Sequence, residues 1–422
     1  MKTLMKGMMY AAMVCMLVMM NACDNGPTLS KHKVQALDLT TDEKEINEDL
    51  NEFAVDMLQE VCNNNSGNVF ISPLSCSFAC SMIANGAKGE TLNEMLEAMD
   101  VEDYSMSELN TYYLKLMEKL PYQDRTSAVK IANGLWADST YTLLDSYVDN
   151  IRTHFLATVE PLDTDNPEVA AELINNWASK QTEGLIKKVV DASQIDDDAH
   201  IVVANALYFK GKWENGFKSS HTRTMTFHAP QGEVQTEMMN GEIEASVTPS
   251  YRYDEDDYTP YEANERMLRL YYKDKGYCMD IIMPNTDFDT WLEEFDMEQY
   301  EELCVALKDG KVEVTMPKFK MTKHYDLIPV MQKLGMKKVF SAGADLGGMT
   351  QENMLSLGVL QQDTYVEVDE SGTKAAAVTS GIMCDEASPS LSFIADHPFI
   401  FFIRDVKNGI ILFAGKYANP NS

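Results

Sequence analysis

Strongly apolar runs in the second half of the chain constrain the fold most. Residues 201–209, 278–283 and 399–403 carry apolar side chains at both odd and even positions, with Asn205 and Asp280 as the only polar residues. Strands with this pattern are typical of a sheet that is covered on both faces. Five more segments have strand-like composition: 128–136, 268–272, 312–319, 364–368 and 410–415. The sequence therefore predicts a large, covered β-sheet.

The first half of the chain has a helical pattern instead. Residues 42–60 place apolar side chains near one helical face, and Asp42 is predicted to be the N-cap. Further helices are predicted at 75–85, 91–98, 107–120 and 165–180. A length of 422 residues would by itself suggest two or three domains. However, there is no repeat, low-complexity block or internal linker, and the pattern predicts one mixed α+β domain.

The composition narrows the range of functions. The formal net charge of −31 argues against a nucleic-acid partner, which would require clustered Lys and Arg. It also disfavours adhesion to anionic lipid through a basic patch, so contact with a membrane is expected only through a lipid on Cys23. None of the seven histidines has metal-ligand spacing, and no nucleophile elbow, phosphate loop or dinucleotide fingerprint is present. Cys76 and Cys80 are interpreted as buried structural thiols. Neither an enzyme nor a cofactor or metal site is therefore expected.

Residues 1–22 are interpreted as a targeting segment. Lys2 and Lys6 precede a short apolar run, which ends in Met-Asn-Ala before Cys23 and resembles a bacterial lipobox. In this interpretation Cys23 becomes the lipid-bearing N-terminus, and residues 23–38 form a flexible tether to a domain at 39–422. The protein would then lie in the bacterial cell envelope, facing the periplasm or the cell exterior. Ordinary secretory cleavage, with Cys23 incidental, is the alternative.

Five segments spread along the chain resemble the signatures of the serpin family, the serine protease inhibitors. They are 68–75 (NVFISPLS), 205–213 (NALYFKGKW), 326–346 (with DL, LGM, VF and ADL), 370–378 (ESGTKAAAV) and 396–401 (DHPFIF). The resemblance implies an α+β serpin fold with three β-sheets, eight or nine helices and an exposed reactive loop at about 371–391. It also implies a monomer whose partner is a serine, or a cysteine, protease.

The implied mechanism is suicide inhibition. The protease cuts the reactive loop and becomes an acyl-enzyme, and the cut loop then inserts into the main sheet as a new strand and traps the protease. The resemblance assigns the hinge of this loop to Glu370, Gly372, Thr373, Ala375, Ala376 and Ala377. Alternate residues from Thr373 to Met383 would face the core after insertion, and none of them is charged. The uncharged run 375–384 would give about 33 Å of strand.

Hydrogen bonds that hold the sheet closed before insertion are also implied by the resemblance. The matching positions are Asn68, Ser72, Ser75, Asn205, Gln362 and Trp213, the last of which lies below the entry point of the loop. The family often has a histidine where this chain has Gln362. Glutamine both donates and accepts, so the network is expected to survive without a titrating group.

The scissile bond has two candidate positions. Counting forward from Glu370 and Thr373 by the spacing of the family places it at Glu386–Ala387. Counting back from Pro398 places it at Ala387–Ser388. The first site suits a Glu-specific protease, and the favoured second site suits an elastase-like one. The alternative functions are a non-inhibitory serpin that acts as a binding or carrier protein, and a surface hydrolase.

Overall fold

The computed structural model describes residues 33–182, 184, 186–195, 200–253, 260–351, 355–373 and 391–422. Contacts within the chain group Lys31–Ser422 into one compact unit. The predicted leader, Cys23 and residues 374–390 of the predicted reactive loop lie outside the described residues. No helix among the described residues is both long enough and apolar enough to span a bilayer.

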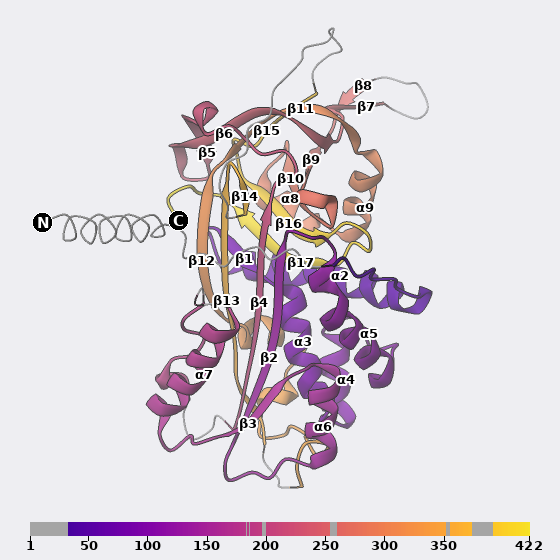
Figure 1. Cartoon of the computed structure of the whole chain (residues 1–422), viewed down its shortest axis with the longest axis vertical. Coiled ribbons are helices and arrows are strands. Elements are labelled where there is room, and N and C mark those ends of the chain that lie inside the picture. Colours follow the sequence, from indigo (N-terminus) through magenta and orange to yellow (C-terminus); the bar gives the residue numbers. More distant parts are fainter. Residues whose placement is uncertain are drawn as a thin grey trace, which may run out of the picture. The chain divides into compact units, whose positions relative to one another are not determined.

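The main sheet has six strands and forms the long face of the unit (Figure 1). Its order is β12 (Phe319–Asp326), β13 (Leu357–Asp369), β14 (Gly372–Thr373), β4 (Ile201–Lys212), β2 (Ala128–Asp138) and β3 (Thr158–Leu162). All of β4 is buried except its last residue, which is partly exposed. The prediction of strands apolar on both faces is thus confirmed at β4.

A second sheet has nine strands and carries the other apolar runs. Its order is β1 (Val69–Ile71), β17 (Ile411–Tyr417), β16 (Phe399–Asp405), β10 (Tyr277–Pro284), β9 (Glu265–Tyr271), β6 (Gly232–Val247), β11 (Lys308–Pro317) and β15 (Leu391–Ile394), with β5 (Arg223–Ala229) paired to β6. Every residue of β10, β16 and β17 is buried. A separate small hairpin joins β7 (Tyr251–Tyr253) to β8 (Pro260–Glu262).

The helices cover both faces of the main sheet. They are α2 (Thr41–Asn63), α3 (Pro73–Ala84), α4 (Gly89–Glu97), α5 (Met106–Lys119), α6 (Asp145–His154), α7 (Pro167–Gln181), α8 (Phe288–Glu294), α9 (Met297–Ala306) and α10 (Ile328–Lys333). Every residue of α3 is buried. On the opposite face, Ile174 and Ala178 of α7 pack in a separate cluster with Trp136 and Val202 of the sheet.

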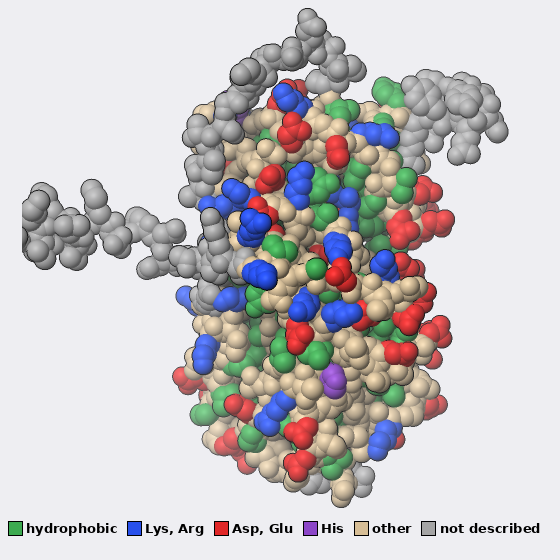
Figure 2. Space-filling model, turned by 45° about the vertical axis from the view of Figure 1, so that its right-hand side comes forward, with side chains coloured by type: hydrophobic (Ala, Val, Ile, Leu, Met, Phe, Trp, Pro, Cys, Tyr) green, Lys and Arg blue, Asp and Glu red, His purple; other side chains and the backbone are tan. Residues whose placement is uncertain are grey.

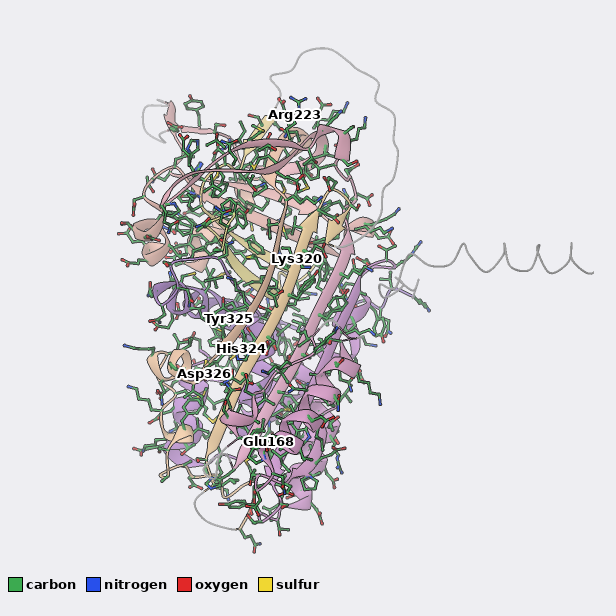
Figure 3. The ribbon with its side chains drawn as sticks, turned by 90° about the vertical axis from the view of Figure 1, so that its left-hand side faces the viewer. Glu168, Arg223, Lys320, His324, Tyr325 and Asp326 are labelled. Atoms are coloured by element: carbon green, nitrogen blue, oxygen red, sulfur yellow. The ribbon has the colours of Figure 1, made fainter. Side chains whose placement is uncertain are left out.

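Two local predictions are wrong. The first long helix is capped by Thr40 rather than Asp42, because the Thr40 hydroxyl accepts from the Glu43 N–H and the Glu43 carboxylate accepts from the Thr40 N–H. The predicted strand 312–319 is in fact two strands in different sheets, since β11 ends at Pro317 and β12 starts at Phe319. Proline lacks the N–H that a continuing ladder needs. Figure 3 shows Lys320, His324, Tyr325 and Asp326 along β12.

Candidate functional site

A two-residue strand, β14, lies between two longer strands of the main sheet. Gly372 pairs with Asp369 of β13 on one side and with Lys212 of β4 on the other, and both pairings are antiparallel. At the far end of the sheet β13 and β4 pair directly and in parallel, from Leu357↔Ile201 to Gln361↔Ala204. Between β14 and this parallel pairing, residues 362–367 of β13 and 205–210 of β4 form no ladder with each other in the described structure.

Only glycine fits at position 372. Its φ of +139° is a conformation that L side chains rarely adopt. A Cβ atom there would lie 2.4 Å from the carbonyl oxygen of Gly211 and 2.6 Å from the Cα of Lys212. Both neighbours are backbone atoms that cannot rotate away. The sequence motif at the hinge thus has a direct steric cause.

We expect Gly372→Ala to detach the hinge from the sheet. The Trp213 N–H donates to the Ser371 carbonyl at 2.9 Å, so its hydrogen exchange reports whether the hinge is docked. The variant should exchange this amide at least about tenfold faster. Gly232→Ala is the matched control, because Gly232 has φ +125° but no atom within 4 Å of a built Cβ. Equal exchange in the two variants would contradict the steric argument.

Trp213, the residue after β4, binds the end of β13 just before the hinge. Its indole Nε1 donates to the carbonyl of Asp369 at 3.0 Å. Its ring stacks on Tyr272, with centroids 4.6 Å apart and an interplanar angle of 17°. The aromatic ring is therefore a core side chain and also a hydrogen-bond donor to the hinge.

Glu370 fixes the same segment from the other side. Its carboxylate accepts from the Thr222 hydroxyl at 2.7 Å and pairs with Lys318 at 3.2 Å. Its carbonyl accepts from the Phe217 N–H at 2.7 Å. Burial favours the neutral acid, but these donors outweigh burial and hold the pKa of Glu370 below its ordinary value. The hinge therefore begins at an ionised, fully bonded residue.

A reciprocal pair of hydrogen bonds links β13 to the start of α3. The Ser72 N–H donates to the Gln362 Oε1 at 2.9 Å, and the Gln362 Nε2 donates to the Ser72 carbonyl at 2.8 Å. The Ser72 hydroxyl caps α3 by accepting from the Ser75 N–H at 3.2 Å, and it donates to the Leu412 carbonyl at 2.7 Å. Gln362 thus satisfies the backbone N–H of a buried serine and gives its carbonyl a second donor besides the Cys76 N–H.

The network continues across the sheet from Ser75. Its hydroxyl contacts the Oδ1 of Asn205 on β4, and the Asn205 amide donates to Asn133 on β2. The Asn133 amide then donates to the Phe155 carbonyl at 2.8 Å. Hydrogen bonds thereby connect side chains of β13, α3, β4 and β2. The network lies next to Gln361↔Ala204, the last pair of the parallel β13–β4 ladder.

Gln362→Ala should destabilise the native fold by about 3 kcal/mol, because it leaves the buried N–H of Ser72 without its partner and removes one of the two hydrogen bonds to the Ser72 carbonyl. Gln361→Ala provides a matched control on the same strand, since the Gln361 Oε1 has no hydrogen-bond partner among the described residues. We expect the control to lose about 1 kcal/mol or less. Urea unfolding measures both, and equal losses would contradict the role given to Gln362.

Asn68 does not belong to this network, so the prediction that placed it there is wrong. Its Nδ2 donates to the Asn419 carbonyl at 2.7 Å, and its Oδ1 accepts from the N–H groups of Ala418 and Asn419. Asn68 thus fastens the C-terminal end of the chain to the start of β1. The cause is its position before β1, which pairs with the final strand β17.

The structure adds residues that the sequence motifs did not single out. Asn133 extends the network, and the Thr364 hydroxyl donates to the Phe70 carbonyl at 2.5 Å. Lys318 and Thr222 bind Glu370 from distant segments. Asn133 lies within an apolar strand-like run, and a lone amide there is the one signal that could have identified it.

The remaining predicted residues lie outside the described part of the chain. These are Cys23, Ala375, Ala376, Ala377, Glu386, Ala387 and Ser388. Of the residues that the structure does describe, none form a cluster of three or more His, Cys, Asp or Glu side chains suited to a metal.

Solved structures of known fold superpose closely on this chain. Native tengpin, a thermophilic serpin, has a TM-score of 0.80 and 25% identity, and the match covers 92% of this chain and 97% of that one. Thyroxine-binding globulin in complex with thyroxine has a TM-score of 0.77 and 24% identity, covering 90% and 99%, and shows a shared fold alone.

Sequence comparisons agree with the fold. Leukocyte elastase inhibitor of Xenopus laevis is 32% identical over 378 residues, covering 87% of this chain and 97% of that protein. A serpin-like protein of Thermococcus kodakarensis is 33% identical over 386 residues, covering 90% and 86%. A family model described as "Serpin (serine protease inhibitor)" matches residues 48–420. Together with the α+β fold and the short strand β14 inside its main sheet, these matches establish that the chain belongs to the serpin family.

Proposed function

We propose that this serpin is a suicide-substrate inhibitor of serine, or cysteine, endopeptidases, which traps the acyl-enzyme by inserting its cut loop into the main sheet. The observation that carries the proposal is the register of β14. Thr373 pairs with Gly211 of β4 and with Val368 of β13. A loop that continued in this register would enter the unpaired stretch between these two strands.

The register also matches the length of the uncharged run. Continued residue by residue, Ala375 falls opposite Phe209, and Met383 falls opposite Ile201, the first residue of β4. On the other side Cys384 falls opposite Leu357, the first residue of β13. The next charges after Lys374 are Asp385 and Glu386, which then lie beyond both strands. The uncharged run therefore fills the slot beyond Lys374, whose side chain would lie on the face of the sheet opposite to that of Thr373.

The composition of the loop argues for an elastase-like or Glu-tolerant target. The loop has no Lys or Arg after Lys374, so proteases with an acidic primary pocket lack a residue to bind. We favour cleavage at Ala387–Ser388, with Glu386–Ala387 as the second position. The relative named leukocyte elastase inhibitor supports the same class of target by similarity.

Incubation with a panel of elastase-like, Glu-specific and trypsin-like proteases tests the proposal. We expect a denaturant-resistant 1:1 complex with an elastase-like or Glu-specific enzyme and a C-terminal fragment that begins at Ser388 or Ala387. Inhibition of trypsin through this loop would contradict the target class. If every protease either cuts the chain without forming a complex or leaves it intact, the result would instead favour the binding or carrier function. The shared fold with thyroxine-binding globulin gives no further support to that alternative.

We also propose that Cys23 carries the lipid that anchors the inhibitor in a bacterial cell envelope. The support is the lipobox-like sequence before Cys23, preceded by a short apolar run with two lysines. Mass spectrometry of the protein from bacterial membranes should find a lipid-modified N-terminal Cys23. An unmodified N-terminus at any other residue would overturn this anchor.

A further inference from the structure

Four separate segments meet around the first described residues, 33–38. The Gln35 N–H donates to the Tyr122 carbonyl, and the Gln123 side chain donates to the Gln35 carbonyl, each at 3.0 Å. The loop around Gly276 packs on Gln123, and its carbonyl accepts from the Val406 N–H at 3.0 Å. Residues 33–38, 115–126, 273–276 and 404–408 therefore form one continuous surface, which we call the entry face.

The entry face is rich in cations although the chain is strongly acidic. Its basic residues are Lys33, Lys115, Lys119, Arg125, Lys273, Lys275 and Lys407, all of them at least partly exposed. The whole chain has a formal net charge of −31. Figure 2 shows many Lys and Arg side chains over the middle of one face, with some Asp and Glu side chains among them and more along the right-hand edge. The entry face is thus locally basic on a strongly acidic chain.

Few free carboxylates oppose these cations. Asp38 pairs with Lys407, and Glu43 pairs with Lys115. Asp124 is 1% exposed and turns inward, where it accepts hydrogen bonds from Thr126 and Ser127.

Glu118 and Asp274 are the exposed acids left within the described segments of the entry face, and exposed Glu214 borders it, since its carboxylate accepts from the Asp274 N–H at 3.2 Å. Arg125, Lys273 and Lys275 form no ion pair with any carboxylate that the structure describes, and Lys275 lies over the Tyr271 ring at 5.0 Å. These three cations are free to bind an external anion.

The length of the tether connects this face to a membrane. Ten residues separate Cys23 from Lys33, counting Lys33 itself, and they span at most about 35 Å. We propose that the entry face binds the anionic headgroups of the membrane that holds Cys23, and so fixes the orientation of the inhibitor on that membrane. The orientation role depends on the proposed lipid anchor, whereas the affinity for anionic headgroups does not.

The physical basis is the attraction of basic side chains to an anionic lipid surface. Each Lys or Arg near such a surface increases binding by up to about fivefold, and the effect decays within a Debye length. An acidic protein without such a patch would be repelled. A tethered protein with one basic face is instead held with that face toward the lipid.

Vesicle sedimentation tests the affinity without any lipid anchor. Residues 24–422 contain both core clusters, so this chain keeps the whole fold. At low salt it should sediment with vesicles of phosphatidylcholine mixed with phosphatidylglycerol, and it should stay in solution with phosphatidylcholine alone. The variant Arg125→Gln, Lys273→Gln, Lys275→Gln should bind at least about tenfold more weakly.

A variant of equal charge away from the entry face is the matched control. Lys308→Gln, Lys333→Gln, Lys337→Gln removes three exposed lysines from β11, α10 and the turn after α10, and it should bind like the parent chain. Equal loss in both variants, no binding of the parent chain, or binding to a sulfated polysaccharide in place of vesicles would overturn the proposal. Failure of Cys23 to carry lipid appears separately in the mass spectrum and leaves the vesicle result intact.

Discussion

If the proposed inhibition takes place, Thr373→Arg is expected to convert the protein from an inhibitor into a substrate. Position 373 pairs with Val368, whose side chain is fully buried, and directly opposed residues of an antiparallel pair share one face of the sheet. In the intact chain position 373 is the last residue of the two-residue strand β14, so an arginine there can fray away from the sheet. Insertion of the loop would instead fix the unpaired charge in the core, at a cost of several kcal/mol. About 3 kcal/mol on the insertion barrier slows that step by about a hundredfold. Hydrolysis of the acyl-enzyme should then occur first.

The measured quantity is the ratio of two products: the covalent complex with the target protease and the free, cut chain. Ala376→Arg is the matched control, because residues an odd number of positions apart in a strand face opposite sides. This control should retain most of the complex. Loss of complex in both variants would show that a charge anywhere in the loop blocks inhibition, and it would contradict the argument from alternation.

Cleavage of the loop in the wild-type chain should raise the melting temperature by about 10 °C or more. Ten inserted residues would exchange the short β13–β4 ladder for hydrogen bonds on two sides, a net gain of about 10 kcal/mol. For a domain of about 390 residues, the entropy of unfolding converts this gain into a shift of that size. Differential scanning calorimetry of the intact and cut chains measures the shift.

The same experiment on Thr373→Arg separates insertion from other effects of cleavage. The cut variant should melt close to its intact form, because its loop stays outside the sheet. If the cut wild-type chain also melts with the intact one, no strand enters the sheet and the proposed mechanism is wrong. A shift of equal size in both proteins would show that position 373 is not the gate.

The apolar pattern of the sequence predicts the fold well because a strand that is buried on both faces must be apolar at nearly every position. The run at 201–209 becomes the buried core of β4, and the helix predicted at 42–60 lies within α2. The same pattern cannot mark a change of sheet, so 312–319 was predicted as one strand although β11 and β12 separate at Lys318.

For the predicted hydrogen-bond network, the sequence identified most of the residues but not all of their partners. Family motifs brought together Ser72, Ser75, Asn205 and Gln362, and the structure joins these four by hydrogen bonds. Asn68 belongs to the same motif but bonds to the C-terminus. A motif records which residues occur together, whereas a hydrogen-bond partner depends on contacts between segments hundreds of residues apart.

The position of the network at the upper end of the parallel β13–β4 ladder has a mechanical consequence. An advancing loop would peel that ladder apart one rung at a time from Gln361↔Ala204 downward, rather than shear all its rungs at once. Each broken rung would be replaced at once by new bonds on both sides of the incoming strand. The energy barrier to insertion would then be set by breaking the first of these pairings. Next to it, hydrogen bonds connect Gln362 to Ser72, Ser72 to Ser75 and Ser75 to Asn205. Substitutions in this network should therefore govern the speed at which the trap closes, while the length of the uncharged loop governs how far it closes.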